Sequence, residues 1–439
     1  LHIVSRRQRQ MCIRDSILAI LIALLLTGMP IFAGLGLTAI VITVASEGSI
    51  SSIADTVFAK LDNGLLTAIP MFAFMAHVMI RSKVVDDLYD AANALVGHFK
   101  GGLGVATVLA CTVFAAISGS SVATALTIGS SAIPQMQRFG YRPSDTYGVI
   151  AAGGTLGILI PPSGPLILYA VVSETSIGAL FIAGLIPGIM MAMLFASYSI
   201  AQGYFRSELR QTDWIGLAGC GHAMRKSIWS LLMPPVVLGG IYMGIFTASE
   251  AAGIGCIYAL FVGSVIYRNF GIKDLAQTAY DTVCTTAMLF MILGGAAMFG
   301  HAVTIIRLPI ELMESVTALG LGPMQFILVV MFVIFILGMF LETIAIILIT
   351  TPIVLPALMQ FDVNLIWYGI LLMINLELAL ITPPVGMNLF VIKGIANAPL
   401  ADVIRGVLPY VVLMLIGLAL VLLFEPLALW LPQLAGFGV

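Results

Sequence analysis

The chain has 439 residues, of which 60% are hydrophobic and only 9% are charged, and its formal net charge at pH 7 is -2. Soluble globular proteins carry about 25% charged residues, so the composition excludes a soluble enzyme, a disordered regulator and a nucleic-acid-binding protein, which would need a basic surface. Long apolar stretches without the alternation of a barrel strand instead predict an all-α, polytopic membrane protein with roughly 11 to 13 transmembrane helices.

The first sixteen residues differ in composition from the rest of the chain. Residues 1–16 are polar and basic, and they adjoin an apolar run that begins at Ile17. No clear small-residue cleavage site follows this run, so we do not expect a removed signal peptide. We expect 1–16 to be a non-native or disordered tail and 17–60 to contain N-terminal scaffold helices.

One sequence motif occurs twice in the chain. GILIPPSGPLILYAV at 157–171 matches ALITPPVGMNLFVIK at 379–393, at a constant offset of 222 residues that also relates flanking Pro, Gly and Phe positions. The offset predicts two repeats, over 61–200 and 278–424. Between them, 201–277 is expected to hold the inter-repeat loop and further scaffold helices, and 425–439 a C-terminal tail.

Each repeat begins with an interrupted apolar segment. SGSS at 118–121 interrupts the first segment, and Leu341-Glu342-Thr343 interrupts the second. The arms are too short to cross a hydrocarbon core of about 30 Å. The pattern therefore predicts re-entrant hairpins over 105–133 and 325–357.

Each hairpin is followed by a helix that contains a Pro-Pro pair. Proline removes a backbone donor and clashes with the preceding turn, so helices over 146–172 and 366–393 are expected to break there. Paired interruptions in corresponding halves are typical of secondary transporters that bind substrate near the bilayer midplane.

The interruptions supply the candidate binding residues. Broken helices present free N–H groups to anions and free carbonyl groups to cations, so we expect Na⁺ sites that involve Ser120, Thr343 and Thr382. Ser121 is expected to cap the second arm of the first hairpin. The predicted substrate- and ion-binding residues are Ser118, Gly119, Ser120, Ser121, Pro161, Pro162, Gly164, Glu342, Thr343, Thr382, Pro383, Pro384, Gly386 and Asn388. An alternative is that these small residues only permit close helix packing.

A few ionisable residues are predicted at membrane depth, where each is a functional candidate because burial of its charge is costly. These residues are His77, Glu250, His301, Glu342, Glu377 and Lys393. Glu342 replaces Ser120 at the second tip, where it could tune cation affinity or pair with Lys393. Glu250 is expected to stabilise a helix N-terminus.

Nucleotide-binding and hydrolase motifs are missing from the sequence, so no catalytic residues and no enzymatic activity are expected. Ion gradients remain as the energy source for transport.

Several of these motifs resemble one family of transport proteins. FAAISGSSVATA (114–125), LGILIPPSGPLILYAV (156–171), FIAGLIPGI (181–189), GIFTASEAAGIGCIYAL (244–260), GMFLETIAIILITTPIVLPAL (338–358) and ITPPVGMNLFVI (381–392) are similar to the large membrane subunit, of DctM type, of tripartite ATP-independent periplasmic (TRAP) transporters. The resemblance extends from about Ile17 to the C-terminus. It implies an ion-transporter-superfamily fold with two inverted-topology repeats and an elevator mechanism.

The resemblance also implies a function and partners. The expected activity is import of a carboxylate-bearing organic acid, such as a dicarboxylate or sialic acid, by Na⁺ symport, with Na⁺ as coupling ion and no other cofactor. The implied partners are a small four-helix membrane subunit (Q type), a periplasmic substrate-binding protein (P type) and the bilayer of the bacterial cytoplasmic (inner) membrane, with no nucleic acid. Alternatives are a stand-alone Na⁺- or H⁺-coupled organic anion symporter of the same superfamily, and a channel or scaffold subunit that does not itself transport.

Overall fold

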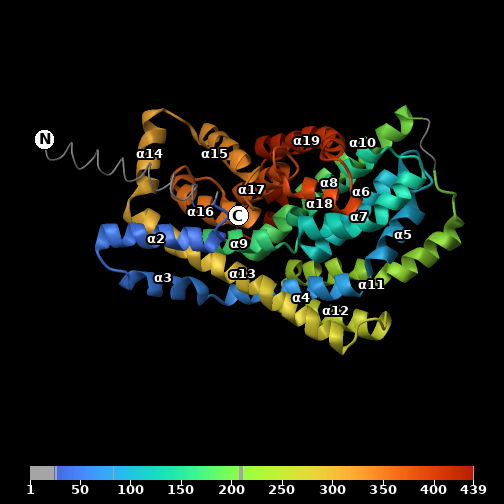
Figure 1. Cartoon of the computed structure of the whole chain (residues 1–439), viewed down its shortest axis with the longest axis horizontal. Helices are drawn as coiled ribbons and strands as arrows, with labels where there is room; N and C mark the ends of the chain where they lie inside the picture. The colour runs from blue at the N-terminus through green and yellow to red at the C-terminus, as the bar shows by residue number, and fades with distance from the viewer. Residues whose placement is uncertain (1–23, 25–26, 83, 207–210, 439) are drawn as a thin grey trace.

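The computed structural model describes residues 24, 27–82, 84–206 and 211–438. The predicted tail at 1–16 and the beginning of the apolar run at Ile17 lie outside these residues. Regular secondary structure in the described ranges is helical (Figure 1).

The helices before the first repeat motif are α2 (Ile31–Glu47), α3 (Ser51–Leu61), the short helix η1 (Gly64–Thr67), α4 (Ala68–Arg81) and α5 (Val84–Val96). The first hairpin and broken helix are α6 (Gly102–Ser118), α7 (Ser121–Arg138), α8 (Pro143–Leu159) and α9 (Gly164–Ser173). The middle of the chain forms α10 (Ile177–Phe205), α11 (Gly216–Tyr242), α12 (Ala248–Phe261), η2 (Val262–Ile266), α13 (Ile272–Ile305) and α14 (Leu308–Ala318). The second hairpin and broken helix are α15 (Pro323–Gly338), α16 (Thr343–Gln360), α17 (Leu365–Leu380) and α18 (Met387–Ala396), followed by α19 (Leu400–Leu423) and α20 (Pro426–Leu434).

The predicted fold class is confirmed. Seven of the described helical segments are long and apolar enough to cross a membrane, and five shorter apolar helices have 10–17 residues. The two halves also contain the same elements at the sequence offset of 222 residues: α7 begins at Ser121 and α16 at Thr343, while α8 begins at Pro143 and α17 at Leu365. Both Pro-Pro peptide bonds in the breaks are cis.

The hairpin arms are longer than the sequence predicted, with 16 to 18 residues each. Prolines inside the second arms, among them Pro134 and Pro352, do not end those helices. The Pro-Pro pair at 234–235 likewise lies within the continuous helix α11. At the first break a new helix begins because Ser163 adopts an extended backbone and its hydroxyl accepts from the Leu166 amide at 3.5 Å.

The two repeats exchange contacts in a reciprocal way. The second arm of each hairpin packs against the last segment of the other repeat's broken helix: α16 contacts α9, and α7 contacts α18. The long helix α13 packs against α2, α3 and α4, away from most of the hairpin and broken-helix segments (Figure 1). The hairpins are therefore held by both halves of the chain, next to a wall made by α4 and α13.

Glycine allows one of the closest crossings, between α8 and α19. A Cβ on Gly148 would lie 2.0 Å from the carbonyl oxygen of Gly406, so only glycine fits there without displacing the backbone. Small residues at helix crossings are typical of membrane proteins, in which close backbone approach contributes much of the packing energy.

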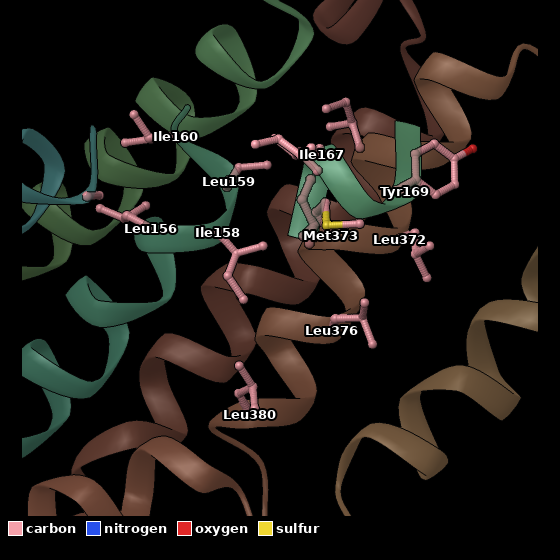
Figure 2. Close-up of a cluster of buried hydrophobic side chains, with 14 of the residues drawn as sticks. Leu156, Ile158, Leu159, Ile160, Ile167, Tyr169, Leu372, Met373, Leu376 and Leu380 are labelled. Carbon is pink, nitrogen blue, oxygen red and sulfur yellow. The ribbon is translucent and has the colours of Figure 1, made fainter. Parts of the chain in front are cut away.

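A buried apolar cluster fills the space between the first break and α17 (Figure 2). Leu156 at the end of α8, Ile167 in α9 and Met373 in α17 are at most 1% exposed. The Tyr169 hydroxyl adds a polar connection between the repeats, since it donates to the carbonyl of Leu365 at 2.6 Å. The break in the first repeat is thus fixed by packing against the second repeat.

Candidate functional site

A cavity of about 300 Å³ lies between the interrupted segments of both repeats and the wall formed by α4 and α13. Its lining includes residues from both hairpin tips and from the first break. The predicted residues that line it are Ser118, Gly119, Ser120, Ser121, Pro162, Gly164, Glu342 and Thr343. Eight of the fourteen residues singled out in the sequence therefore meet at one cavity.

The tip of the first hairpin is a tight turn against the first break. Helix α6 ends at Ser118, and Gly119 follows with a positive φ of 60°. A Cβ on Gly119 would lie 2.3 Å from the carbonyl oxygen of Pro162. Glycine is required here both by its left-handed backbone and by the close approach of the break.

The cap of α7 differs from the sequence prediction. Ser120, not Ser121, is the capping residue, because it alone has the extended backbone from which its hydroxyl can accept from the Ala123 amide, at 3.4 Å. Ser121 is the first helical residue. The prediction that Ser121 caps the helix is therefore wrong by one position.

Ser121 instead joins the two repeats. Its hydroxyl donates to Oε1 of Glu377, which lies in α17. Both residues are buried, with exposed fractions of 2% for Ser121 and 1% for Glu377, and Oε2 of Glu377 has no hydrogen-bond partner among the described residues. Both residues stand out in the sequence as candidates, but their pairing does not, because 256 positions separate them.

The second hairpin tip carries a carboxylate. Glu342 is at the N-cap position of α16, yet its side chain makes no capping hydrogen bond. The suggested pairing with Lys393 is not seen within the described ranges; the Lys393 ammonium lies 5.9 Å from the centre of the Phe390 ring. The Glu342 carboxylate therefore lines the cavity without an ion-pair partner in the structure described.

The remaining predicted residues do not line this cavity. These are Pro161, Thr382, Pro383, Pro384, Gly386 and Asn388. The Thr382 hydroxyl donates to the carbonyl of Leu378 at 2.6 Å. Asn388 is fully buried at the start of α18, and both polar atoms of its amide lack a partner in the described part of the chain.

Other membrane-depth candidates have different surroundings. Glu250 forms a capping box with Thr247 at the start of α12, which confirms its structural role. His77 lines the cavity on the α4 wall together with Thr285 on α13. The sequence offered no signal for Thr285, because its place depends on how α13 packs against α4.

Comparisons with known proteins show which family the chain matches. Residues 18–427 match the family described as "Tripartite ATP-independent periplasmic transporter, DctM component". A C4-dicarboxylate TRAP transporter large permease protein, DctM, of Pseudomonas aeruginosa is 40% identical over 412 residues, which cover 92% of this chain and 95% of the relative.

Two further comparisons concern a longer relative and a solved structure. An isethionate TRAP transporter permease protein, DctMQ, of Oleidesulfovibrio alaskensis is 35% identical, over 89% of this chain but 62% of the relative. Other relatives are named as sialic acid and ectoine permeases. The crystal structure of the Alcanivorax borkumensis YdaH transporter shares the fold, with a TM-score of 0.65, 14% identity and 88% coverage of both chains.

Proposed function

This chain belongs to the DctM family of tripartite ATP-independent periplasmic transporters as a large permease subunit, and on that premise we propose that it imports a carboxylate-bearing organic acid by Na⁺ symport. A periplasmic binding protein would deliver the substrate to it at the bacterial inner membrane. The observation that carries the proposal is the cavity between the two hairpin tips.

Four helices begin at this cavity. Ser121, Gly164, Thr343 and Met387 are the first residues of α7, α9, α16 and α18, and all four line it. The N-terminus of a helix carries a partial positive charge and unpaired N–H groups, which favour bound anions. The convergence of four such ends supports a carboxylate as the substrate group that binds there.

Side chains of the cavity lining, together with two predicted residues outside it, supply oxygens that fit a sodium ion. Na⁺ takes oxygen ligands, and hydroxyl, amide and carbonyl oxygens are present here together with the Glu342 carboxylate. The Ser120 hydroxyl retains its proton and a lone pair, Thr382 keeps lone pairs after donating to Leu378, and the buried Asn388 oxygen has no partner among the described residues. We propose that Ser120, Thr343, Thr382 and Asn388 would hold Na⁺ when it binds.

The packing suggests which part of the protein moves. The hairpins and broken helices contact one another reciprocally, whereas α13 packs chiefly with α2, α3 and α4. We therefore propose an elevator movement of the first group against the second. The DctMQ relative, of which this chain covers 62%, supports a Q-type membrane subunit as a further partner.

The test uses the purified chain with its Q-type subunit. Thermal unfolding is followed in NaCl, KCl and choline chloride at equal ionic strength. A ligand at ten times its Kd stabilises the native state by about 1.4 kcal/mol, so we expect a Na⁺-specific rise in the unfolding midpoint that Ser120→Ala and Thr343→Ala reduce. Ser130→Ala is the matched control, since that exposed hydroxyl donates to the Thr127 carbonyl in its own helix and does not line the cavity.

Equal midpoints in the three salts would contradict Na⁺ coupling. In proteoliposomes, Na⁺-driven uptake should require the binding protein. Uptake by the chain and its Q-type subunit without that protein would instead favour a stand-alone symporter.

A further inference from the structure

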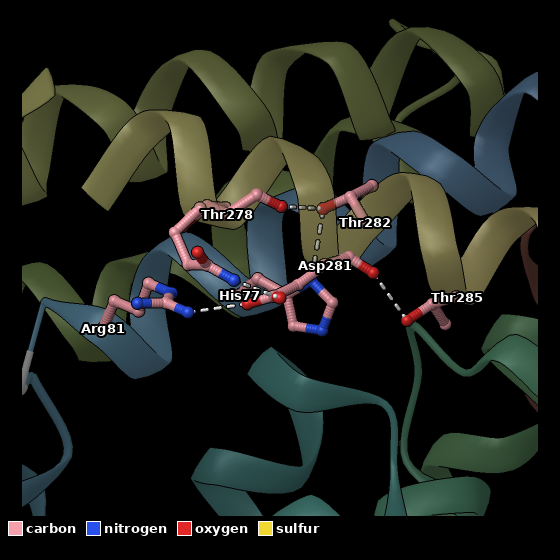
Figure 3. Close-up of polar contacts among 7 residues, drawn as sticks. His77, Arg81, Thr278, Asp281, Thr282 and Thr285 are labelled. Carbon is pink, nitrogen blue, oxygen red and sulfur yellow. Dashed lines mark hydrogen bonds and ion pairs between the residues drawn. The ribbon is translucent and has the colours of Figure 1, made fainter. Parts of the chain in front are cut away.

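A network of hydrogen bonds joins α4 to α13 along the wall of the cavity (Figure 3). Nδ1 of His77 lies 3.1 Å from the Thr282 hydroxyl oxygen. One turn further along α4, the Arg81 guanidinium pairs with the Asp281 carboxylate at 2.6 Å. His77 and Thr285 are the polar members of the cavity lining on these two helices; the other lining residues there are apolar.

The network fixes the position of the histidine proton. The Thr282 hydroxyl has one proton and donates it to the Thr278 carbonyl at 2.7 Å. Its oxygen can then only accept, so Nδ1 of His77 must carry the hydrogen in their shared bond. In a neutral imidazole, Nε2 is consequently the acceptor, and it lies on the side of the ring away from Thr282 (Figure 3).

The acid beside the ring has hydrogen-bond partners of its own. One Asp281 oxygen pairs with Arg81 at 2.6 Å, and the other accepts from the Gln277 amide at 2.9 Å. Both oxygens of the carboxylate are thus bonded to other groups, and neither is bonded to His77. His77 therefore presents a lone pair, not a proton, from this wall.

The Thr285 hydroxyl is also a hydrogen-bond acceptor, because its proton is already used in another bond. It donates to the backbone carbonyl of Asp281 at 2.9 Å, which commits its only proton. The oxygen that lines the cavity can accept but cannot donate. The α4–α13 wall consequently offers two acceptors, opposite hairpin tips at which helix N-termini offer donors.

We propose that the His77–Thr285 wall selects organic acids that carry a hydroxyl or another hydrogen-bond donor at the end remote from the carboxylate, over acids that carry a second carboxylate there. The oxygens of a second carboxylate would face the acceptor atoms of His77 and Thr285, and no hydrogen would be available to form a bond between them. The inference rests on the proposed function, and it specifies the substrate class of the same site.

Matched pairs of small acids test the inference in the purified chain with its Q-type subunit, in saturating NaCl. The first pair is 4-hydroxybutyrate and succinate, which differ only in a terminal hydroxyl or carboxylate. The second is 3-hydroxypropionate and propionate, which differ by the hydroxyl. A net hydrogen bond corresponds to about a tenfold change in affinity, so the hydroxyl-bearing member should stabilise the protein with an about tenfold lower apparent Kd.

Variants then test whether the preference for the hydroxyl-bearing acid depends on His77 and Thr285. His77→Phe and Thr285→Val should each remove most of the preference and leave the Na⁺-specific stabilisation in place, whereas Thr285→Ser should retain it. Thr304→Val is the matched control, because Thr304 makes the same kind of bond on α13, to Gly300 at 2.9 Å, but does not line this cavity.

A Na⁺-specific stabilisation combined with equal affinities, or with no effect of either acid in both pairs, overturns the inference and leaves the proposed function intact. A preference that His77→Phe and Thr285→Val do not change also overturns it. Loss of any Na⁺ effect together with the absence of acid binding contradicts the proposed function, and the inference fails with it.

Discussion

The hydrogen bond between Ser121 and Glu377 should stabilise the fold measurably. Glu377 Oε2 already lacks a partner among the described residues, so Ser121→Ala would leave the buried carboxyl group without a hydroxyl donor. An unsatisfied buried polar group costs about 1–3 kcal/mol, and more when it is charged. We expect Ser121→Ala to lower the free energy of unfolding by about that amount, and Ser130→Ala in the same helix to change it by less than about 0.5 kcal/mol.

A double-mutant cycle isolates the pair. Glu377→Met alone removes the acceptor, and the double variant removes both partners, so the cycle should yield a coupling energy of about 0.5–3 kcal/mol. Denaturant unfolding in mixed micelles, followed by tryptophan fluorescence, provides the measurement; Trp367 lies on the same helix as Glu377. If the two single effects add to within about 0.5 kcal/mol, the bond does not connect the repeats energetically and the reasoning is refuted.

Three further substitutions test other parts of the structure. Gly119→Ala should abolish the Na⁺-specific rise in unfolding midpoint, because its Cβ would lie 2.3 Å from the Pro162 oxygen; Gly253→Ala, with nothing within 4 Å, is the control, and an unchanged Na⁺ response would contradict the tip geometry. Gly148→Ala should destabilise the protein by about 1–3 kcal/mol, since its Cβ would lie 2.0 Å from a carbonyl oxygen of α19, and an unchanged denaturation midpoint would argue against this crossing. Thr247→Ala should cost about 1 kcal/mol of stability through loss of the α12 cap while the apparent Na⁺ affinity stays the same; a shift in that affinity in a Na⁺ titration would show that α12 affects the ion site.

The repeated elements could be predicted because the same motif occurs twice in the sequence, at a constant offset. The offset between Pro161–Pro162 and Pro383–Pro384 locates both breaks, and the structure begins new helices soon after each, at Gly164 and Met387. Proline alone was not sufficient, since Pro234–Pro235 lies within α11. A correct assignment also needed the residues after the pair, where a glycine follows in both repeats.

Pairings across the two halves could not be predicted from sequence. Glu377 meets Ser121 and not a residue of its own repeat, because the second arm of one hairpin packs with elements of the other half. His77 meets Thr282 across two helices whose register depends on side-chain packing along their whole length. The cap of α7 shifted to Ser120 because one backbone turn, at Gly119, decides which serine is extended.

The reciprocal packing of the hairpins also determines the order in which their contacts can form during synthesis. Ser121 leaves the ribosome 256 residues before Glu377, and at 5–20 residues per second this interval is about 13–50 s. Throughout that time α7 has neither the carboxylate that accepts its first hydroxyl nor α18, against which it packs. We therefore expect the first half to form without these contacts, which become available only when the second half has been made.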